Sequence, residues 1–233
     1  MPKEKVVVSL GGSVMVPGED DSEYIKSLAE LLIQLSAKYK LFVVTGGGRL
    51  ARYYIEVGRE LGMDERTLDE LGIVITRLNA RLLIQALGPG AFPKPPEEYE
   101  EARRAATNHD IVVMGGHRVS ITTDAVAAEL AEAVEASRLV NATSVDGVYT
   151  ADPKVDSSAA RIDSMSYEEL IRIAGRPTGL AGPTIVFDPY AAQVVRRARL
   201  PVYVVQGRDL ESLEGAITNR DFEGTRIGGG EGR

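Results

Sequence analysis

The chain contains no cysteine and only two histidines among its 233 residues. The absence of cysteine excludes disulfide bonds and thiol chemistry, and it is compatible with a reducing compartment. His109 and His117 are too few to build a Ser-His-Asp triad or a histidine-based metal site. Hydrolase and zinc-enzyme functions are therefore not expected.

The sequence also lacks an excess of positive charge and any long apolar run. Its 27 Lys and Arg against 34 Asp and Glu give a net charge of −7, so nucleic acid and anionic lipid are not attracted in bulk and a polyanionic ligand must be held locally. Apolar stretches such as 125–134 are interrupted by Glu and are too short to span a membrane. With no signal peptide expected, we predict a cytoplasmic protein without nucleic-acid or membrane partners.

Hydrophobic residues make up 44% of the chain, which is enough for a substantial core. Short apolar segments typical of buried strands alternate with segments of helical periodicity. The expected strands are 5–10, 41–45, 111–114, 139–145 and 201–205, and the expected helices include 22–40, 67–87, 190–199 and one starting near Thr123. This alternation favours an α/β protein with parallel strands.

Three of the expected strands end in glycine turns, at Gly11-Gly12, Gly46-Gly47-Gly48 and Gly115-Gly116. Such turns let backbone N–H groups approach phosphate oxygens, although a single one is as often an ordinary tight turn. Because the carboxyl ends of parallel strands meet at one edge of a sheet, the first two turns could face the same phosphate chain. The pair favours a phosphate site more than either turn alone.

Several polar side chains near these turns each allow two interpretations. Arg52, one helical turn beyond Gly48, is either a fixed cation for phosphate or a solvated helix residue. Asp69 is either a ribose ligand or an anion favoured near a helix N-terminus. The segment 117–123 leads into a helix N-terminus, where an anion is favoured, but His117 alone is better explained as a polar loop residue. Asp188, followed by proline, is explained as a helix N-cap.

The loop Asp146–Pro153 follows the strand expected at 139–145. It carries two Asp, a Tyr and a Thr, which could contact a ribose, a base edge and a metal-bound phosphate. The same residues would also suit a surface turn.

Five segments occur in an order and spacing that generic α/β composition does not produce. They are LGGSV at 10–14, TGGGRLARYYIEV at 45–57, GIVITRLNARLLI at 72–84, the MGG and TTDAVAA stretches of 114–128, and VDGVYTADPK at 145–154. With these segments the chain, from about Val6 to Ile227, resembles the amino acid kinase family, and within it the archaeal-type uridylate (UMP) kinases.

The resemblance implies a three-layer αβα sandwich with a mainly parallel central sheet, formed by residues 1–233 as a single domain. An acceptor-binding lobe would extend to about 137, an ATP-binding lobe would cover about 138–227, and 228–233 would be a disordered tail. The implied reaction is Mg²⁺-dependent transfer of the γ-phosphoryl group of ATP to UMP by a homohexamer.

The resemblance also assigns residues by position, and the metal ligands stay unassigned. Asp124 would organise the charges around the transferred phosphoryl group, and Asp188 is a second catalytic candidate. The ATP ligands would be Gly12, Ser13, Gly48, Arg52, Thr143, Ser144, Tyr149 and Asp152. The UMP ligands would be Gly47, Asp69, His117, Arg118, Val119, Ser120, Ile121, Thr122 and Thr123.

One departure from the family pattern concerns charge. Many members carry a lysine two residues before the first glycine, where this chain has Ser9. The cation that stabilises the transferring phosphoryl group must then be Mg²⁺, Lys5 or Arg52, or be replaced by N–H groups of the glycine turns.

Two alternative functions remain within the family. Isopentenyl phosphate kinase also phosphorylates a phosphate, but its isoprenoid substrate requires an apolar channel, whereas Asp69, Arg118, Ser120 and Thr122 are polar. An ATP-binding protein that stores metal oxyanions would not turn over a small substrate, and the intact glycine turns together with Asp124 argue against it.

Overall fold

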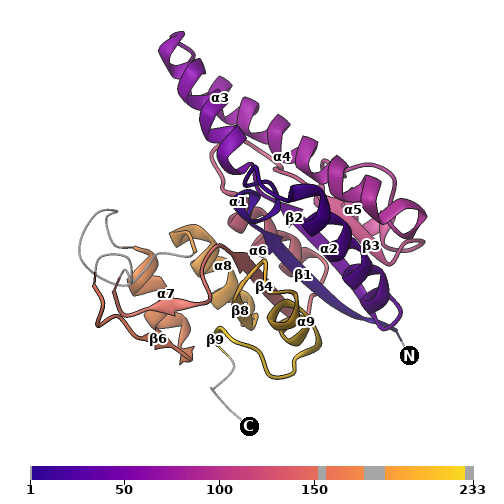
Figure 1. The fold of residues 1–233 in the computed structure, drawn as a ribbon, viewed down its shortest axis with the longest axis vertical. Coiled ribbons are helices and arrows are strands. Elements are labelled where there is room, and N and C mark those ends of the chain that lie inside the picture. The colour runs from indigo at the N-terminus through magenta and orange to yellow at the C-terminus, as the bar shows by residue number, and fades with distance from the viewer. Residues whose placement is uncertain (1, 152–155, 176–186, 229–233) are drawn as a thin grey trace.

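The computed structural model describes residues 2–151, 156–175 and 187–228. Within these ranges, seven strands form one sheet in the order β3-β2-β1-β4-β8-β9-β7 (Figure 1). The strands of this sheet are β1 (Glu4–Leu10), β2 (Tyr39–Thr45), β3 (Ile111–Met114), β4 (Arg138–Thr143), β7 (Ser164–Met165), β8 (Val202–Gln206) and β9 (Thr225–Ile227). The first four strands and β8 run parallel, and β9 is antiparallel to β8. A separate antiparallel pair joins β5 (Val148–Tyr149) to β6 (Arg161–Ile162).

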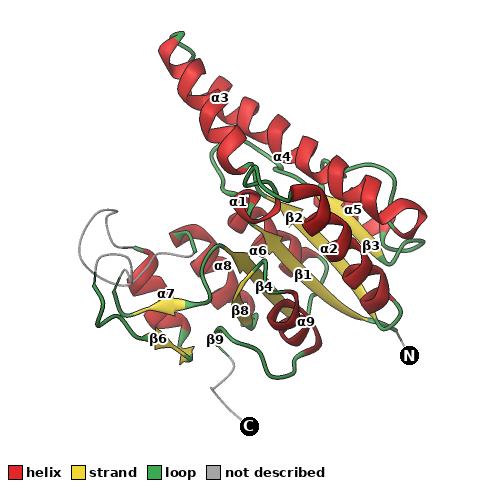
Figure 2. Ribbon diagram, in the orientation of Figure 1, coloured by secondary structure: helices red, strands yellow, loops and turns green. Residues whose placement is uncertain are grey.

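Helices cover both faces of the sheet (Figure 2). One face packs against α1 (Gly12–Met15), α2 (Asp21–Ser36), α4 (Glu65–Leu87) and α9 (Leu210–Thr218). The other packs against α5 (Tyr99–Ala105), α6 (Thr123–Ala133), α7 (Tyr167–Ala174) and α8 (Pro189–Ala198). A 3₁₀ turn, η1 (Gly88–Gly90), follows α4, and α3 (Gly48–Glu60) pairs with α4. The predicted αβα sandwich with a mainly parallel sheet is confirmed.

The two cores follow the alternation of side chains along each strand. In β1, Val6 and Val8 join the core under α2 and α4, whereas Val7 joins the core under α6 and α8. Ser9 shares the face of Val7 and therefore points toward α6. The Ser9 hydroxyl is thus directed to the N-terminal end of that helix, where it donates to Asp124.

Several expected element boundaries were wrong, each for a local reason. The helix expected over 22–40 ends at Ser36, because Tyr39 and Lys40 pair with β1 and begin β2. The short helix α1, directly after the first glycine turn, was not expected. The helix expected at 67–87 begins earlier, because the Asp64 side chain accepts a hydrogen bond from the Thr67 N–H at 2.9 Å.

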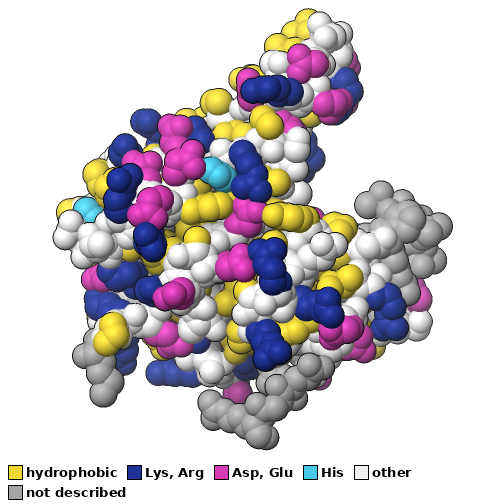
Figure 3. Space-filling view, turned by 180° about the vertical axis from the view of Figure 1, so that it is seen from behind, with side chains coloured by type: hydrophobic (Ala, Val, Ile, Leu, Met, Phe, Trp, Pro, Cys, Tyr) yellow, Lys and Arg dark blue, Asp and Glu magenta, His cyan; other side chains and the backbone are white. Residues whose placement is uncertain are grey.

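The helices α3 and α4 form a hairpin that projects beyond the rest of the molecule (Figure 1). Residues 65–90 are long and apolar enough to cross a membrane by length and composition alone. The core helix of a soluble protein satisfies the same criterion, and Ala80 and Leu83 of this helix are fully buried against the sheet. On the face shown in Figure 3, basic and acidic side chains are interspersed.

Two predictions fall on residues that are only partly described. Asp152 and residues 229–233 of the predicted tail lie outside the described ranges. Gly228, the first residue of that tail, donates its N–H to the Met165 carbonyl at 3.1 Å.

Candidate active site

The first two glycine turns touch each other backbone to backbone at the carboxyl edge of β1 and β2. A Cβ atom on Gly12 would lie 2.2 Å from the Gly48 nitrogen and 2.6 Å from the Gly46 carbonyl oxygen. Gly48 itself has φ +63°, which favours glycine. No side chain fits between the turns, so the N-terminal ends of α1 and α3 converge. First-turn N–H groups have no helical partner and are available to an anion.

Arg52 links these two turns through its side chain. Its Nη2 donates to the Ser13 Oγ at 3.0 Å, which joins α3 to α1. The side chain is exposed and its charge lies beside the converging helix ends. Of the predicted ATP-phosphate ligands, the structure thus brings Gly12, Ser13, Gly48 and Arg52 together.

Residues of α4 hold the second glycine turn in place through hydrogen bonds. The Asn79 Nδ2 donates to the Gly46 carbonyl at 2.8 Å, and the Thr45 hydroxyl donates to the Thr76 carbonyl at 2.9 Å. All three side chains are buried. Such satisfied buried polar groups make the turn rigid.

The third glycine turn differs from the other two. The Gly116 N–H donates to the Thr76 hydroxyl at 2.6 Å, and a Cβ on Gly115 would lie 2.7 Å from the Arg77 nitrogen. This turn is therefore closed against α4. It holds the start of the acceptor segment, which we define as residues 117–123.

The acceptor segment is attached to three other parts of the chain. The His117 Nδ1 lies 2.8 Å from the Glu97 carbonyl, and the Ser120 N–H donates to the Asp69 carboxylate at 2.7 Å. Ser120 has φ +66°, an uncommon conformation that this bond helps to hold. The Thr122 hydroxyl donates to the Asp188 carboxylate, and Asp188 also caps α8. The structure therefore places Asp69 beside the segment that was predicted to bind UMP with it.

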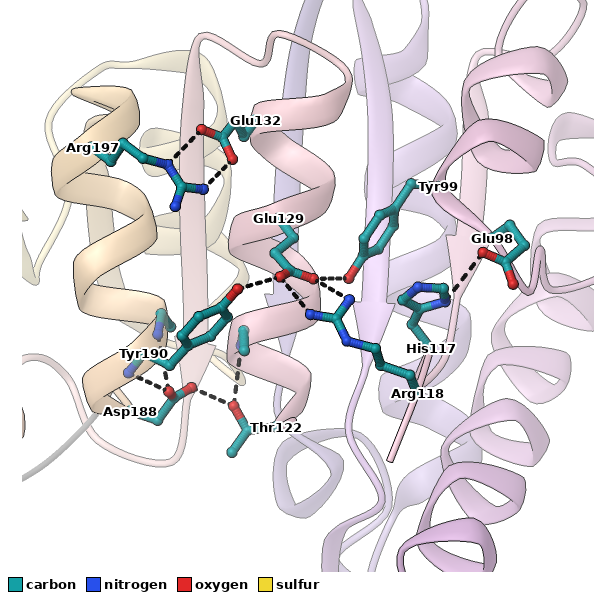
Figure 4. A network of polar contacts seen from close by, with 12 residues as sticks. Glu98, Tyr99, His117, Arg118, Thr122, Glu129, Glu132, Asp188, Tyr190 and Arg197 are labelled. Atoms are coloured by element: carbon teal, nitrogen blue, oxygen red, sulfur yellow. Dashed lines mark hydrogen bonds and ion pairs between the residues drawn. The ribbon is translucent and has the colours of Figure 1, made fainter. Parts of the chain in front are cut away.

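Arg118 makes an ion pair with Glu129 of α6 (Figure 4). Its two Nη atoms donate to the two carboxylate oxygens at 2.9 and 2.8 Å. The hydroxyls of Tyr99 and Tyr190 each donate to the same carboxylate at 2.6 Å. Burial alone would raise the pKa of Glu129, but the bonds from Arg118, Tyr190 and Tyr99 outweigh it and lower the pKa to about 2.

Asp124 stands in the first turn of α6, whose N-cap Thr122 accepts the Ala125 N–H at 3.1 Å. Ser9 of β1 donates its hydroxyl to the Asp124 Oδ1 at 2.8 Å. Burial raises the pKa of Asp124 to about 6; the Ser9 bond opposes this rise, and the nearby carboxylate of Asp188 adds to it. The charge of Asp188, the second catalytic candidate, thus acts on Asp124.

Lys5 is not the missing cation. Its Nζ donates to the Val134 carbonyl at 2.8 Å, at the amino end of β1. Five residues of strand, roughly 17 Å, separate it from the glycine turns. At the position of the family lysine, Ser9 provides a neutral hydroxyl that holds Asp124.

The predicted nucleoside end of the ATP site adjoins the first turn. The Gly11 N–H donates to the Ala142 carbonyl at 3.0 Å, and the Gly207 N–H donates to the Thr143 carbonyl at 2.8 Å. The end of β4, with Thr143 and the exposed Ser144, therefore lies beside the glycine turns. The Tyr149 hydroxyl donates to the Asp146 carboxylate at 2.8 Å, in the loop that follows.

The described residues contain no group of three or more His, Asp and Glu side chains that could hold a metal ion. Magnesium usually binds through substrate phosphates, water and one or two carboxylates. Asp124 lies near enough to Asp188 for the charge of Asp188 to act on it, so these two carboxylates could hold such a metal, which would arrive bound to a nucleotide.

Sequence reasoning missed Glu129, Thr76 and Asn79. Each acts through a partner far along the chain, such as Tyr190 of α8 for Glu129 and Gly46 for Asn79. The helical periodicity gave no signal for these contacts. A polar residue within the buried stripe of α4 was the only local indication for Asn79.

The sequence profile described as the amino acid kinase family matches residues 4–206. The chain belongs to the amino acid kinase family. Its sequence is similar to the uridylate kinase of Methanocorpusculum labreanum, with 47% identity across 96% of this chain and 95% of the relative. It is also similar to the uridylate kinase of Archaeoglobus fulgidus, with 45% identity across 87% of this chain and 91% of that protein.

Two solved structures show the same fold. The crystal structure of uridylate kinase from Archaeoglobus fulgidus has a TM-score of 0.86 and 43% identity, and covers 96% of this chain and 99% of its own. The UMP kinase of Bacillus anthracis has a TM-score of 0.80 at 21% identity, with 97% and 96% covered. The second likeness concerns the fold alone.

Proposed function

We propose that this protein is a uridylate kinase, which transfers the γ-phosphoryl group of ATP to UMP and yields UDP and ADP. The observation that carries the proposal is the 47% identity to a uridylate kinase over nearly the whole of both chains. The geometry of the site agrees with it: two touching glycine turns for a polyphosphate lie beside a polar acceptor segment.

In this reaction an oxygen of the UMP phosphate forms a bond to the γ-phosphorus, and the bond from that phosphorus to the β–γ bridging oxygen breaks. The UMP phosphate is already ionised near neutral pH, so the attack requires no general base. The protein must align two polyanions and offset their charge. For ATP, the N–H groups of the converging turns and the Arg52 side chain align the phosphates and offset their charge.

Asp124 organises the charged groups at the point of transfer, between the start of α6 and β1. Ser9 holds one of its carboxylate oxygens. Bound Mg²⁺ would supply charge neutralisation at the β- and γ-phosphates, and Asp124 and Asp188 are the carboxylates that would hold it. The predicted nucleoside contacts of ATP are Thr143, Ser144 and Tyr149, together with Asp152.

UMP would lie against Gly47, Asp69 and the acceptor segment. Asp69 and Ser120 already meet across the gap between α4 and this segment. Their polar groups suit a ribose and a uracil, which require hydrogen-bond partners, better than an isoprenoid tail. We therefore favour UMP over isopentenyl phosphate as the acceptor.

We further propose one domain, a cytoplasmic location and a homohexamer. The pairing of β1 with both β2 and β4 makes the sheet continuous across the boundary between the two lobes. Exposed apolar side chains at Val74, Leu78 and Leu82 recur every fourth residue along α4. Such a stripe supports burial between copies of the chain.

An assay of UDP formation tests the proposal. The purified protein is supplied with ATP, Mg²⁺ and UMP, and UDP is separated and quantified, with Asp124→Asn as the matched blank. We expect UDP formation that depends on Mg²⁺ and on UMP. ATP binding without UDP formation would overturn the proposal and favour a storage protein.

A further inference from the structure

Glu129 lies where four elements meet (Figure 4). Each of its carboxylate oxygens accepts two hydrogen bonds, one from Arg118 of the acceptor segment and one from a tyrosine. Tyr99 belongs to α5 and Tyr190 to the first turn of α8. The Glu129 side chain is only 13% exposed, so its charge depends on these partners.

The donors around Glu129 are suited to a permanent contact. Burial and the neighbouring carboxylate raise the pKa of Tyr99, so its hydroxyl stays a donor at neutral pH. The bond to Glu129 likewise raises the pKa of Tyr190. No proton needs to move for the cluster to persist.

Arg118 has both Nη atoms committed to Glu129. If Arg118 turned toward a phosphate instead, the largely buried Glu129 carboxylate would keep only the two tyrosine donors and lose its counter-charge. The structure thus offers Arg118 a specific role that does not involve substrate. Its bidentate geometry fixes the direction in which the acceptor segment leaves the third glycine turn.

The Glu129 cluster and the Thr122–Asp188 hydrogen bond both connect the acceptor segment to the start of α8. Thr122 binds Asp188, and Arg118 reaches Tyr190 through Glu129. Asp188 and Tyr190 are two residues apart at the start of α8. The acceptor segment is therefore attached at both of its ends to the helix terminus that carries a catalytic candidate.

We propose that Glu129 is a positioning residue that holds the acceptor segment in register with the N-terminal end of α8, and that Arg118 acts through Glu129 and not on the UMP phosphate. The kinetic part of this inference rests on the proposed function.

Helix α6 provides a matched control. Glu132, one turn beyond Glu129, forms a similar ion pair with Arg197 of α8, at 2.6 and 3.1 Å. This pair also joins α6 to α8, but it does not contact the acceptor segment. Glu132→Gln therefore removes an ion pair of α6 and a link to α8 while leaving every contact of the acceptor segment in place.

The kinetic test uses Glu129→Gln, Arg118→Ala, the double variant and Glu132→Gln, with UMP and ATP varied in turn. We expect Glu129→Gln to raise the KM for UMP roughly tenfold, with the KM for ATP within about twofold. Arg118→Ala should raise the KM for UMP by the same factor. The double variant should be no worse than either single variant, because the two substitutions remove the same ion pair. Glu132→Gln should leave both constants within about twofold.

Two kinetic results would overturn the inference. If Arg118→Ala adds a further tenfold loss in the Glu129→Gln background, Arg118 contacts substrate directly. If Glu129→Gln is as mild as Glu132→Gln, the cluster does not position the segment.

Hydrogen exchange on the full chain without substrate separates this inference from the proposed function. The Ser120 N–H donates a hydrogen bond to the Asp69 carboxylate. We expect Glu129→Gln to accelerate hydrogen exchange of this amide roughly tenfold relative to Glu132→Gln. Unchanged exchange would contradict positioning even in an active enzyme. A wild-type protein without UDP formation would refute the proposed function while this measurement remained valid.

Discussion

At the scale of single residues, Asp124 joins β1 to α6 through the Ser9 hydroxyl. We expect Asp124→Asn to lower kcat at least about a hundredfold while leaving the Kd of UMP within about threefold. A group that orders charge in the transition state contributes mainly to kcat, and the Asn side chain keeps an acceptor for Ser9. Steady-state kinetics and calorimetric titration of UMP measure the two quantities. A change in KM alone would contradict this role.

Arg52 is the residue for which the two sequence-based interpretations differ most. Its bond to Ser13 places the guanidinium beside the converging turns, and Lys5 lies at the opposite end of β1. We expect Arg52→Ala to worsen the KM for ATP or kcat roughly tenfold or more, because a charge-assisted bond to phosphate is lost. ATP is varied with UMP saturating. Unchanged constants, with a stability change within about 0.5 kcal/mol, would make Arg52 a solvated surface residue.

At the scale of elements, the Glu129 cluster connects α5, α6, α8 and the acceptor segment. The pKa of Glu129 is lowered in the folded protein from 4.5 to about 2. Folding is therefore stabilised above about pH 4.5, and this contribution is lost as the pH falls from there toward 2. At about 1.4 kcal/mol per pKa unit the upper bound is about 3.5 kcal/mol, and solvent screening of this partly exposed cluster reduces it to roughly 2–3 kcal/mol.

Urea titrations of wild-type protein and Glu129→Gln at several pH values check this contribution. We expect the difference in unfolding free energy between the two proteins to shrink as the pH decreases from 5 to 2.5. A difference that stays constant over this range would show that the hydrogen bonds from Arg118, Tyr99 and Tyr190 do not lower the pKa of Glu129.

The elements show what the sequence could and could not predict. The contact of Gly12 with Gly48 could be predicted from the parallel topology, because the turns that follow neighbouring parallel strands lie at the same edge of the sheet. The end of α2 did not follow, because pairing of Tyr39 with Glu4 overrides the helical periodicity. Glu129 could not be found, since its partners come from elements whose packing only the fold determines.

At the scale of the whole molecule, one continuous sheet places the predicted ATP and UMP sites at the same edge. The α3–α4 hairpin contributes Asp69, Thr76 and Asn79 to that edge. It also exposes Leu61, Val74 and Leu78, with Leu61 74% exposed. This distribution agrees with the proposed assembly of several copies.

We expect Leu78→Glu to reduce the molar mass measured by light scattering, because a charge would be buried between copies. Glu30→Lys, at an exposed position on α2, serves as the control and should leave the mass unchanged. If both variants keep the wild-type mass, the α4 stripe is not an interface.

Competition between two acceptors in one tube shows whether the acceptor is a nucleotide. The enzyme receives ATP and Mg²⁺ with equal concentrations of UMP and isopentenyl phosphate, and ³¹P NMR follows both diphosphate products. The ratio of initial rates gives the ratio of kcat/KM values for the two acceptors. We expect UDP to form at least about ten times faster than isopentenyl diphosphate. Faster formation of isopentenyl diphosphate would mean that UMP is not the preferred acceptor.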